Sequence, residues 1–599
     1  MSRIAGIVDL ACDVEIKDDI LKTLHRTPVN DHGYYMRDDA MFLHRSISGC
    51  NCGQPIQIMR GNKRYIIVFD GELYNSESLY QELLKLGHNI PTKTDASIAL
   101  CAYLEWEEDA LYKFIGAFSF AVWNEQSRTL FLARDKMGIR PMFYALHHNG
   151  LIFSSEIKTI LRYPTFHTEL DEEGIAQVML IGPGRIPGSG VFKNVLELEP
   201  GHYLIYKGRS VSIQRYWSLQ DRIHMEDFDE TADHVRYLVT ESILRQIDNQ
   251  VGALLSGGLD SSIINAICSN KLNEQGRTLK TFSVDYLGND VHFIPERFQP
   301  ESDNQYIEIM RQEINSDHHR IVLNAKDLVN CLENATKARD LPGMADIDFS
   351  LMSFAEKIKK DCPSVLSGEC ADEIFGGYPW FTDASVRPSN GFPWSQNISY
   401  RANFISRAYK INANEYVNDQ YNTSMKYCNL LPENSFEDLS VKKMTWLNHY
   451  WFMQTLIDRN DRMCMYSGLK IRAPFCDPAI AEYLFAIPWS YKYYSNREKG
   501  ILRHAMRGLI PDKILWRKKS PYPKTYDPEY TKMVKIRLRQ LLTEKNAALW
   551  DIIDRDAASK LLIEEDLMPW YGQLMKGPQT IAFFLQIDYW LKEYKISLV

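Results

Sequence analysis

The sequence feature that most constrains the fold is a short loop, rich in glycine and serine, between an apolar run and a helical pattern. The apolar run is VGALL, and the string after it consists of Ser256, Gly257, Gly258, Leu259, Asp260, Ser261 and Ser262. Glycines let backbone amides approach a phosphate closely, and a helix N-terminus adds unpaired N–H groups and a favourable dipole. In this strand–loop–helix setting, the string predicts a phosphate-binding loop rather than a plain glycine turn. Asp260 would repel a phosphate, so it is expected to hold a bridging Mg²⁺ ion.

The second half of the chain alternates between strand-like and helical stretches. Asp227 to Gln250 has the pattern of an amphipathic helix, while TFSVDY (281–286) and PSVLSG (363–368) are short apolar runs bounded by helical stretches. From residue 439 onward, nearly everything is helical and aromatic. Strands alternating with helices, with glycine turns at the strand ends, predict a doubly wound parallel sheet. We expect a helical C-terminal part to follow that sheet.

The first part of the chain is different, because β-type runs separated by turn residues dominate it. The runs are YIIVFDG, GAFSFAVWN, TLFLARD, LIFSSE and HYLIYKG, and helical patterns interrupt them at Ser78–Gly87 and Asp95–Trp106. This order predicts stacked, mostly antiparallel sheets with a few helices outside. The pattern changes after QRYWSL (214–219), and 599 residues are too many for one core. Two domains are therefore expected, at 1–215 and 216–599.

Composition excludes several classes of partner and location. The chain is 45% hydrophobic and 24% charged with a formal net charge of −8, which argues against nucleic acid or an anionic membrane as the main partner. No apolar run is long enough to span a bilayer, and no secretory signal is visible. The 11 cysteines are scattered, and the closest pair, Cys50 and Cys52, lacks a matching Cys or His group. A reduced, cytoplasmic protein is expected, with no nucleic acid and no membrane among its partners.

Three further blocks join the phosphate loop in one recognisable order. They are LSGECADEIFGGY (366–378), DRMCMYSGLKIRAPFCD (461–477) and KGILRHAMRGLIPDKILWRKKSPYP (499–523). The loop is similar to the pyrophosphate loop of N-type ATP pyrophosphatases, and the chain resembles the asparagine synthetase family. Its motifs for the first two blocks read SGEGADELFGGY and DRxSMAxGVEVRVPFLD, and its closing segment carries a catalytic lysine. The resemblance covers nearly the whole chain.

The resemblance implies a chemistry and a set of site residues. A carboxylate attacks the α-phosphate of ATP to give an acyl-adenylate and pyrophosphate, and an amine then displaces AMP to form an amide. ATP and Mg²⁺ are the implied cofactors. Asp260 and Asp372 are the implied metal ligands. Glu369 suits the base that takes the amine proton, and Lys519 suits the counter-charge for developing negative charge. The residues expected to bind nucleotide are Leu254, Ser256, Gly257, Gly258, Leu259, Asp260, Ser261, Ser262, Val284, Ser367 and Gly368.

The first domain also resembles the family, but it departs at the glutaminase site. DGELYN (70–75), RDKMGIRPMFY (134–144) and FSSEIKTIL (153–161) match glutaminase-domain motifs, which implies an N-terminal-nucleophile αββα sandwich. The family's nucleophilic Cys at position 2 is Ser2, its following Gly is Arg3, and its oxyanion-hole Asn is Asp70. HRGPD has become HRTPV (25–29), and the glutamine-clamping arginine has no secure match, with Arg26 and Arg45 nearby. We therefore expect an inactive structural remnant, since Cys12 cannot replace Ser2 without an unusual cleavage.

A ligase of this type without its own ammonia source must take its amine elsewhere. Two kinds of relative do so: β-lactam synthetases close a ring with an internal amine, and lasso-peptide cyclases join a peptide's N-terminal amine to an internal Asp or Glu. The length of 599 residues, the aromatic- and Asn-rich segment 379–460, and Lys470 in place of the family's Glu favour the lasso-peptide cyclase. A peptide substrate is then the expected partner, with a leader protease or leader-binding protein as further candidates. The oligomeric state is left open.

The alternatives differ in the source of the amine. One is an asparagine synthetase that uses free ammonia, or glutamine through Ser2, and another is ring closure as in β-lactam synthetases. A non-catalytic scaffold belongs to a different class. Asp260, Asp372, Glu369 and Lys519 together weigh against it, because a scaffold has no need of all four.

Overall fold

The computed structural model describes residues 2–24, 31–46, 53–293, 301–382, 391–564, 568–572 and 575–599. Arg26 and the rest of HRTPV, Cys50, Cys52 and residues 383–390 of the aromatic segment lie outside these ranges. The chain forms two compact units. Unit 1 comprises Met1–Leu170 and Pro187–Ser218, and unit 2 comprises Asp171–Ile186 and Leu219–Val599.

This division differs from the expected domains of 1–215 and 216–599 in two ways. Unit 1 ends three residues later, at Ser218, and one internal segment changes unit. The segment Asp171–Ile186 belongs to unit 2, although it lies within the first domain in sequence. The reason is a buried arginine of unit 2, Arg401, whose guanidinium donates to the carbonyls of Leu180 and Gly182. Such a long-range contact leaves no local signal in the sequence.

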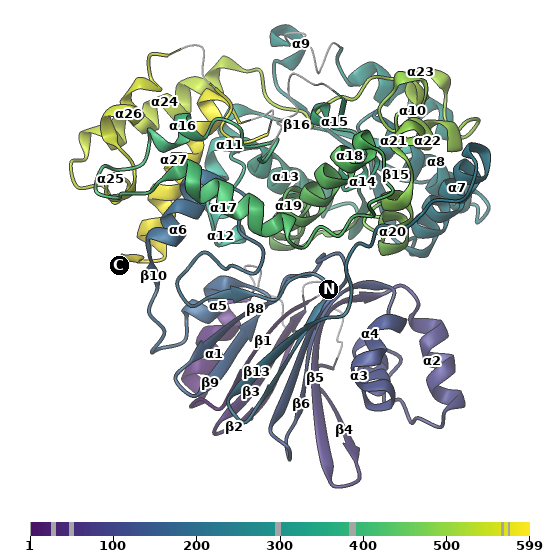
Figure 1. Cartoon of the computed structure of the whole chain (residues 1–599), viewed down its shortest axis with the longest axis vertical. Helices are drawn as coiled ribbons and strands as arrows, with labels where there is room; N and C mark the ends of the chain where they lie inside the picture. Colours follow the sequence, from purple (N-terminus) through teal and green to yellow (C-terminus); the bar gives the residue numbers. More distant parts are fainter. Residues whose placement is uncertain are drawn as a thin grey trace. The chain divides into compact units, whose positions relative to one another are not determined.

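Unit 1 contains two six-stranded sheets packed face to face (Figure 1). Their strand orders are β11-β8-β9-β1-β3-β2 and β13-β12-β7-β6-β5-β4, and every registered pair is antiparallel. Side chains from both sheets share one apolar core, for example Phe42 and Phe153 from one sheet with Ile66 and Trp123 from the other. The strands of these two sheets are β1 (Ser2–Val8), β2 (His32–Arg37), β3 (Ala40–Ser46), β4 (Ile56–Arg60), β5 (Lys63–Leu73), β6 (Gly116–Asn124), β7 (Thr129–Arg134), β8 (Phe143–His147), β9 (Gly150–Ser154), β11 (Leu196–Glu197), β12 (His202–Lys207) and β13 (Ser210–Arg215). The short strand β10 (Glu169–Leu170) belongs to neither sheet.

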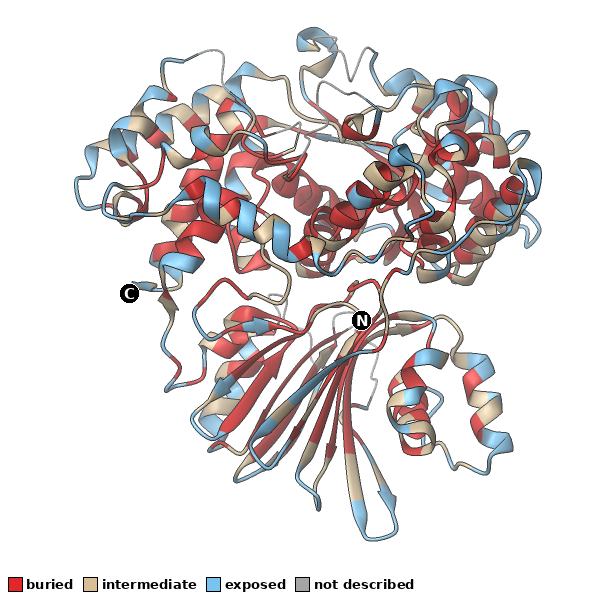
Figure 2. Cartoon of the chain, in the orientation of Figure 1, coloured by how far each residue is buried: buried red, intermediate tan, exposed pale blue. Residues whose placement is uncertain are grey.

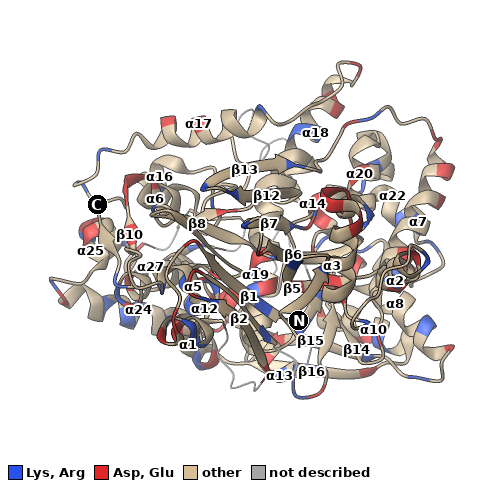
Figure 3. Ribbon diagram, turned by 90° about the horizontal axis from the view of Figure 1, so that it is seen from below, with Lys and Arg blue, Asp and Glu red and all other residues tan. Residues whose placement is uncertain are grey.

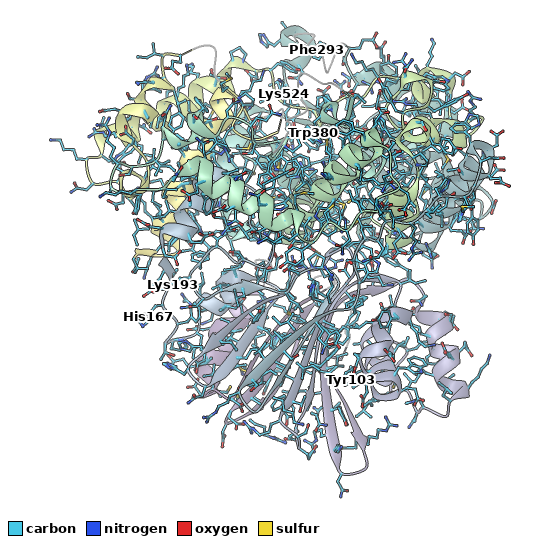
Figure 4. All side chains as sticks on the ribbon, in the orientation of Figure 1. Tyr103, His167, Lys193, Phe293, Trp380 and Lys524 are labelled. Atoms are coloured by element: carbon cyan, nitrogen blue, oxygen red, sulfur yellow. The ribbon has the colours of Figure 1, made fainter. Side chains whose placement is uncertain are left out.

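Helices cover the outer faces of this sandwich. The helices are α1 (Val14–Thr23), α2 (Ser76–Lys85), α3 (Asp95–Trp106), α4 (Ala110–Lys113) and α5 (Ile157–Leu161). A second apolar core joins α2, α3 and α4 to the β5–β6–β7 sheet, and α1 and α5 lie against β3 and β9 of the other sheet. Tyr103 of α3, labelled in Figure 4, packs against Phe131 of β7 with ring centroids 4.8 Å apart and the ring planes tilted by 38°. The predicted αββα sandwich is therefore confirmed.

Unit 2 is built on a five-stranded parallel sheet in the order β16-β15-β14-β17-β18. Its strands are β14 (Val251–Leu254), β15 (Lys280–Tyr286), β16 (Asp317–Leu323), β17 (Ser364–Leu366) and β18 (Lys470–Arg472), and β19 (Ser597–Leu598) lies near the end of the chain. The strand order reverses direction between β14 and β17. Ligands of doubly wound sheets bind in the crevice at the carboxyl end of the strands beside such a reversal. The topology therefore points to the loops after β14 and β17.

The remaining helices belong to unit 2, and Figure 2 shows buried residues concentrated on their inner sides and along the strands. They are α6 (Glu172–Ala176), α7 (Phe228–Arg245), α8 (Leu259–Asn273), α9 (Asn289–His292), α10 (Asn304–Ile314), α11 (Ala325–Asn330), α12 (Leu332–Arg339), α13 (Asp346–Ile358), α14 (Ala371–Phe375), α15 (Pro379–Thr382), α16 (Ile398–Ala402), α17 (Ala413–Met425), α18 (Phe436–Leu447), α19 (Met453–Tyr466), α20 (Pro478–Ala486), α21 (Trp489–Lys492), α22 (Gly500–Ala505), α23 (Asp512–Leu515), α24 (Pro528–Thr543), α25 (Leu549–Ile552), α26 (Arg555–Lys560) and α27 (Gly577–Glu593). The predicted helical C-terminal part is confirmed.

The start of α7 shows how local sequence defines an element. Asp227 caps the helix by accepting from the backbone N–H groups of Asp229 and Glu230, and the Glu230 side chain accepts in return from the Asp227 N–H. This capping box satisfies donors that a helix start leaves unpaired. The helix ends at Arg245, earlier than the predicted Gln250, because Asp248 accepts from the N–H of Gln250 at 2.9 Å in a turn that leads into β14.

Acidic and basic residues are interspersed along the helices in the view of Figure 3. This distribution fits the modest net charge of −8. Among the helices that the structure describes, none has both the length and the apolar content needed to cross a membrane.

Candidate active site

The phosphate loop has the local geometry that the sequence predicts. It follows β14 and ends at Gly258, the N-cap residue of α8. Gly257 has φ +68°, and a Cβ there would lie 2.8 Å from the backbone nitrogen of Ile307. Glycine is therefore required at this position for two reasons. The backbone is left-handed, and it lies too close to the backbone of Ile307 for a side chain. Within the loop, the hydroxyls of Ser256 and Ser261 lie 2.9 Å apart.

A second loop, after β17, lies directly against the first. Gly368 is so close to α8 that a Cβ on it would lie 3.1 Å from the Cβ of Asp260. The short helix α14 then presents Asp372, and an added Cβ on Gly377 would lie only 2.0 Å from the Oδ1 atom of Asp372. The two loops therefore bring Asp260 and Asp372, which are 112 positions apart in sequence, to one place.

The two aspartates are held together by lysines. The Nζ atom of Lys499 lies 2.6 Å from Oδ2 of Asp260 and 2.6 Å from Oδ1 of Asp372. The Nζ atom of Lys519 lies 2.6 Å from Oδ2 of Asp372. The side chain of Lys499 is 2% exposed, whereas that of Lys519 is 28% exposed. Lys499 is thus a buried bridge between the carboxylates, and Lys519 is accessible from the site.

Burial and charge pull the pKa values of the two carboxyls in opposite directions. Burial raises the pKa of Asp260 above its ordinary value, against the attraction of Lys499, and the charge of Asp372 adds to the rise. Burial would also raise the pKa of Asp372, but Lys499 and Lys519 outweigh it and hold that pKa at about 2. The two carboxyls therefore differ in surroundings: two lysines favour the charged form of Asp372, whereas burial and the charge of Asp372 act against that of Asp260.

These residues fit a divalent cation shared with a phosphate. Oδ1 of Asp260 is buried and has no hydrogen-bond partner, which leaves an oxygen for a ligand. Among the described residues, no group of three or more His, Cys, Asp or Glu side chains has the arrangement of a metal cage. Mg²⁺ characteristically binds through one or two carboxylates together with substrate phosphates, so Asp260 and Asp372 suffice.

A pocket of about 220 Å³ opens over both loops. The sequence-predicted residues that line it are Leu254, Ser256, Asp260, Ser261, Val284, Ser367, Gly368, Glu369, Asp372 and Lys519. Gly257, Gly258, Leu259 and Ser262 belong to the loop and the start of α8 but are not among the lining residues. Tertiary structure therefore gathers both predicted catalytic residues and both predicted metal ligands around one cavity.

One wall of the pocket is aromatic. Tyr378 stacks on Trp380 with ring centroids 4.4 Å apart, and both meet Phe452 edge-on at 5.3 and 5.4 Å. Tyr571 stacks on Phe452 at 5.7 Å, and Tyr522 lines the pocket as well. Trp380 is labelled in Figure 4 within unit 2. This wall offers apolar surface to a substrate beside the charged end of the site.

Glu369 has a partner that the sequence did not reveal. Its Oε1 atom lies 2.6 Å from Nη2 of Arg459, a buried arginine of α19 that also lies over the ring of Tyr522, with the guanidinium carbon 4.9 Å from the centroid. The ion pair holds the Glu369 carboxylate in one orientation at the pocket wall. Arg459 precedes the third motif block by two residues, so no motif identified it.

Glu373 is a second glutamate in the pocket, and its surroundings differ from those of Glu369. Burial, reinforced by the charge of Asp372, raises the pKa of Glu373 to about 8. The Tyr378 hydroxyl donates to its Oε1 atom at 2.6 Å. Glu373, Arg459 and Lys499 are the neighbours of the predicted residues that sequence reasoning missed. Two of them carried a signal, because Lys499 opens the fourth block and Glu373 lies within the second, whereas Arg459 lies outside every block.

Lys470, which the sequence suggested as part of an altered acceptor site, does not line the pocket. It begins β18, and its backbone N–H donates to the carbonyl of Pro363 at 3.0 Å, just before β17. The pocket lies at the carboxyl ends of the parallel strands, so Lys470 is at the wrong end of its strand.

The N-terminal site of unit 1 is filled by an ion-pair cluster. Arg3 is 1% exposed, and its guanidinium lies 3.3 Å from Oδ2 of Asp70 and 3.0 Å from Oε1 of Glu156. The Ser155 hydroxyl donates to the same Asp70 oxygen at 3.0 Å. The hydroxyl of Ser2, itself 4% exposed, donates to the carbonyl of Phe69 at 3.3 Å. A carboxylate and a guanidinium thus occupy the surroundings of the residue expected to act as nucleophile.

Comparison with known proteins gives matches over both units. A family model described as asparagine synthase matches residues 234–592, and one described as a glutamine amidotransferase domain matches residues 1–217. A Bacillus subtilis (strain 168) protein named asparagine synthetase (glutamine-hydrolyzing) 3 is 41% identical over 613 residues, covering 100% of both chains. Asparagine synthetase (glutamine-hydrolyzing) 1 of the same strain is 26% identical over 537 residues, or 84% of this chain and 82% of that one. Among solved structures, glutamine phosphoribosylpyrophosphate amidotransferase from B. subtilis matches 54% of this chain and 91% of that chain at 15% identity, with a TM-score of 0.30.

Proposed function

The chain belongs to the asparagine synthase family, and from this premise we propose that it joins a side-chain carboxylate to an amine that its own N-terminal unit does not supply. It is an amide-forming ligase that cleaves ATP to AMP and pyrophosphate. The finer part of the proposal concerns the amine, because the relatives named above are called glutamine-hydrolyzing and this chain departs from the family's glutaminase motifs at Ser2, Arg3 and Asp70.

The observation that carries the proposal is the buried Arg3–Asp70–Glu156 cluster. A glutaminase of this type needs a nucleophile at position 2 and neutral donors for the oxyanion that develops on the amide. Here Asp70 places a carboxylate where that negative charge would form, and Arg3 neutralises it from within the chain. The side chains of the cluster are 0–9% exposed to solvent. They therefore pack in the interior of unit 1 rather than lining an open site for glutamine.

Ammonia release from glutamine tests this part directly. We expect the full-length protein to release no ammonia above the level of its Ser2→Ala variant. A glutaminase activity in the wild-type protein that disappears in Ser2→Ala would show that Ser2 is a working nucleophile. The ligase would then draw ammonia from its own N-terminal unit, and the proposal would fall.

The residues of the pocket suit the two halves of the ligase reaction. The phosphate loop and the α8 N-terminus offer donors for the ATP phosphates, and Asp260 and Asp372 would hold the Mg²⁺ that neutralises them. Lys519 lies at the pocket surface, where it can offset negative charge on pyrophosphate or on the tetrahedral oxyanion. Glu369, held by Arg459, is the candidate base for the attacking amine.

A second, more specific candidate is ring closure within one peptide, as in lasso-peptide cyclases. The observation that favours it is the pairing of the pocket cations. Of the described lining residues, Arg459 and Lys519 are cationic, and they already pair with Glu369 and Asp372. Free aspartate would bring a second carboxylate that needs its own counter-charge. A peptide side chain brings one carboxylate only, and the aromatic wall offers contact to the rest of the peptide.

Intramolecular attack also compensates for the lost ammonia source. A peptide that holds its own amine near the adenylate gains an effective molarity that reaches about 10⁵ M or more in favourable cases. Such a substrate would be delivered with a leader protease or a leader-binding protein as partners. Free ammonia with aspartate is the competing pair, and it is the one that the names of the relatives favour.

Mass spectrometry distinguishes the peptide substrate from the pair of aspartate and ammonia. The peptide candidate predicts that a peptide with a free N-terminus and an internal Asp or Glu loses the mass of one water in the presence of ATP and Mg²⁺. Asparagine formed from aspartate and ammonium, with no peptide dehydration, would instead assign the enzyme as an ammonia-dependent asparagine synthetase.

A further inference from the structure

Two cysteines meet at the edge of the pocket. β17 and β18 are parallel neighbours in which Leu366 is in register with Arg472. Cys370 lies four residues after Leu366, and Cys476 lies four residues after Arg472. Because neighbouring parallel strands run about 4.8 Å apart, equal offsets carry the two loops side by side. The contact is direct, since the Cys370 side chain is hydrogen-bonded to that of Cys476.

Other contacts fix the two loops against each other. The N–H of Ser367 donates to the carbonyl of Arg472 at 2.8 Å, at the base of both loops. Phe375 and Phe475 pack edge to face with ring centroids 6.1 Å apart. Cys370 and Cys476 are 1% and 3% exposed, and both are free thiols. The pair is therefore held in place by the surrounding structure and does not depend on a chance side-chain rotation.

Cys370 is also in an unusual backbone position. Its φ is +75°, in the left-handed region that glycine adopts readily and other residues rarely adopt. The corresponding position in the motif SGEGADELFGGY is glycine, and Cys476 stands where PFLD has leucine. This chain thus places a thiol at each of two neighbouring positions, and it accepts backbone strain at one of them.

We propose that Cys370 and Cys476 form a reversible disulfide that disables the pocket under oxidising conditions. The balanced step with a peroxide as oxidant is two thiols plus one H₂O₂ giving one S–S bond and two water molecules, with each sulfur oxidised by one electron. A thiol reductant restores both thiols. Cys370 is buried but lines the pocket, so a small opening of its loop brings a neutral peroxide in the pocket to its sulfur.

The effect on the site follows from the position of Cys370 between two functional residues. Glu369 precedes it directly, and Asp372 follows two residues later. A disulfide requires the sulfurs to approach to about 2.05 Å, which is shorter than any hydrogen-bonded S···S contact. Closing that gap draws the loop that carries Glu369 and Asp372 toward β18 and α20, away from the phosphate loop. Oxidation should therefore weaken ATP binding.

Peptide mapping tests the bond itself. The full-length protein is treated with hydrogen peroxide, remaining thiols are alkylated, and the digest is analysed by mass spectrometry. We expect a linked pair of peptides containing Cys370 and Cys476 that is absent from Cys476→Ala and from Cys370→Gly. If both thiols remain alkylatable after the other accessible thiols have been oxidised, the proposal is overturned. This readout does not depend on which substrate the ligase uses.

Calorimetry tests the consequence. With ATP and Mg²⁺ as the probe, we expect the affinity of the wild-type protein to fall at least tenfold after peroxide and to return after reduction. In Cys476→Ala, the affinity before and after peroxide should agree within about twofold. An equal loss in the variant would assign the effect to another residue, such as Cys464 of α19, and an unchanged affinity in a linked wild-type protein would refute the switch.

Discussion

Arg3→Met is the sharpest test of the reading of unit 1. The substitution removes the guanidinium while keeping most of the side-chain volume. It leaves Asp70, which is fully buried, without its cation, whereas Glu156 still has Lys158 beside it. Removing one partner of a buried ion pair typically costs about 3–5 kcal/mol. Because Lys158 remains, we expect a loss near the lower end, about 3 kcal/mol in the free energy of unfolding of unit 1.

Differential scanning calorimetry measures this loss as a shift in the transition of unit 1. For domains of about 150–250 residues, 1 kcal/mol shifts the melting temperature by about 2–4 °C, so Arg3→Met should lower it by about 6–12 °C. Arg37→Met is the matched control. Arg37 is 54% exposed and pairs with Glu125 at the surface of the same unit. Exposed pairs of this kind add little to stability, so the control should lower the transition temperature much less than Arg3→Met does.

A double-mutant cycle identifies the cause. Asp70→Asn replaces the buried carboxylate by a neutral amide of similar shape, so Arg3→Met should be less harmful in that background. We expect the double variant to be more stable than the sum of the single losses predicts, by about 1–3 kcal/mol. Strict additivity, or a loss in Arg3→Met no larger than in Arg37→Met, would refute a coupled Arg3–Asp70 pair.

Three further predictions concern unit 2. Asp260→Asn and Asp372→Asn should each abolish detectable binding of ATP in the presence of Mg²⁺, measured by equilibrium dialysis, while circular dichroism stays native; binding that survives in both would place the nucleotide elsewhere. Glu369→Gln should slow amide formation by about 10²–10⁴-fold while ATP–pyrophosphate exchange continues, as expected for loss of one general base; parallel loss of exchange would place Glu369 in nucleotide binding instead. Burial lowers the pKa of Lys492 from 10.5 to about 7. Between pH 7 and pH 10.5 the unfolded chain therefore keeps a proton that the folded protein releases, and stability rises with pH. Lys492→Met should remove the cost of burying the charged amine, which is larger at pH 7 than at pH 9.5. The melting temperature of the variant should therefore exceed that of the wild type most near pH 7, and the difference should shrink by pH 9.5. A difference that does not change with pH would contradict the assignment.

Features that depend on contiguous residues could be predicted before the structure was known. The phosphate loop is a single stretch whose glycines and helix start define its geometry, and the capping box of α7 needs only Asp227 and Glu230. The β-type runs of unit 1 predicted stacked antiparallel sheets and the strand–helix alternation of unit 2 predicted a parallel sheet, because side-chain periodicity is a local property. The αββα order of layers came from the family resemblance. Most of the predicted pocket residues lie in short motifs, and the sheet topology brings those motifs together.

The ion pairs of both sites depend on the three-dimensional fold. Lys499 bridges Asp260 and Asp372, Arg459 holds Glu369, and Arg3 joins Asp70 to Glu156, and each contact joins residues far apart in the chain. Strand order likewise puts Lys470 at the end of β18 away from the pocket, and it puts Cys370 beside Cys476. The role of a buried charged side chain depends on its partner. An unpaired charge costs too much free energy to bury, whereas a paired charge can be stable inside the protein. A local sequence window contains one member of each pair, so its role is decided only when the fold supplies the other.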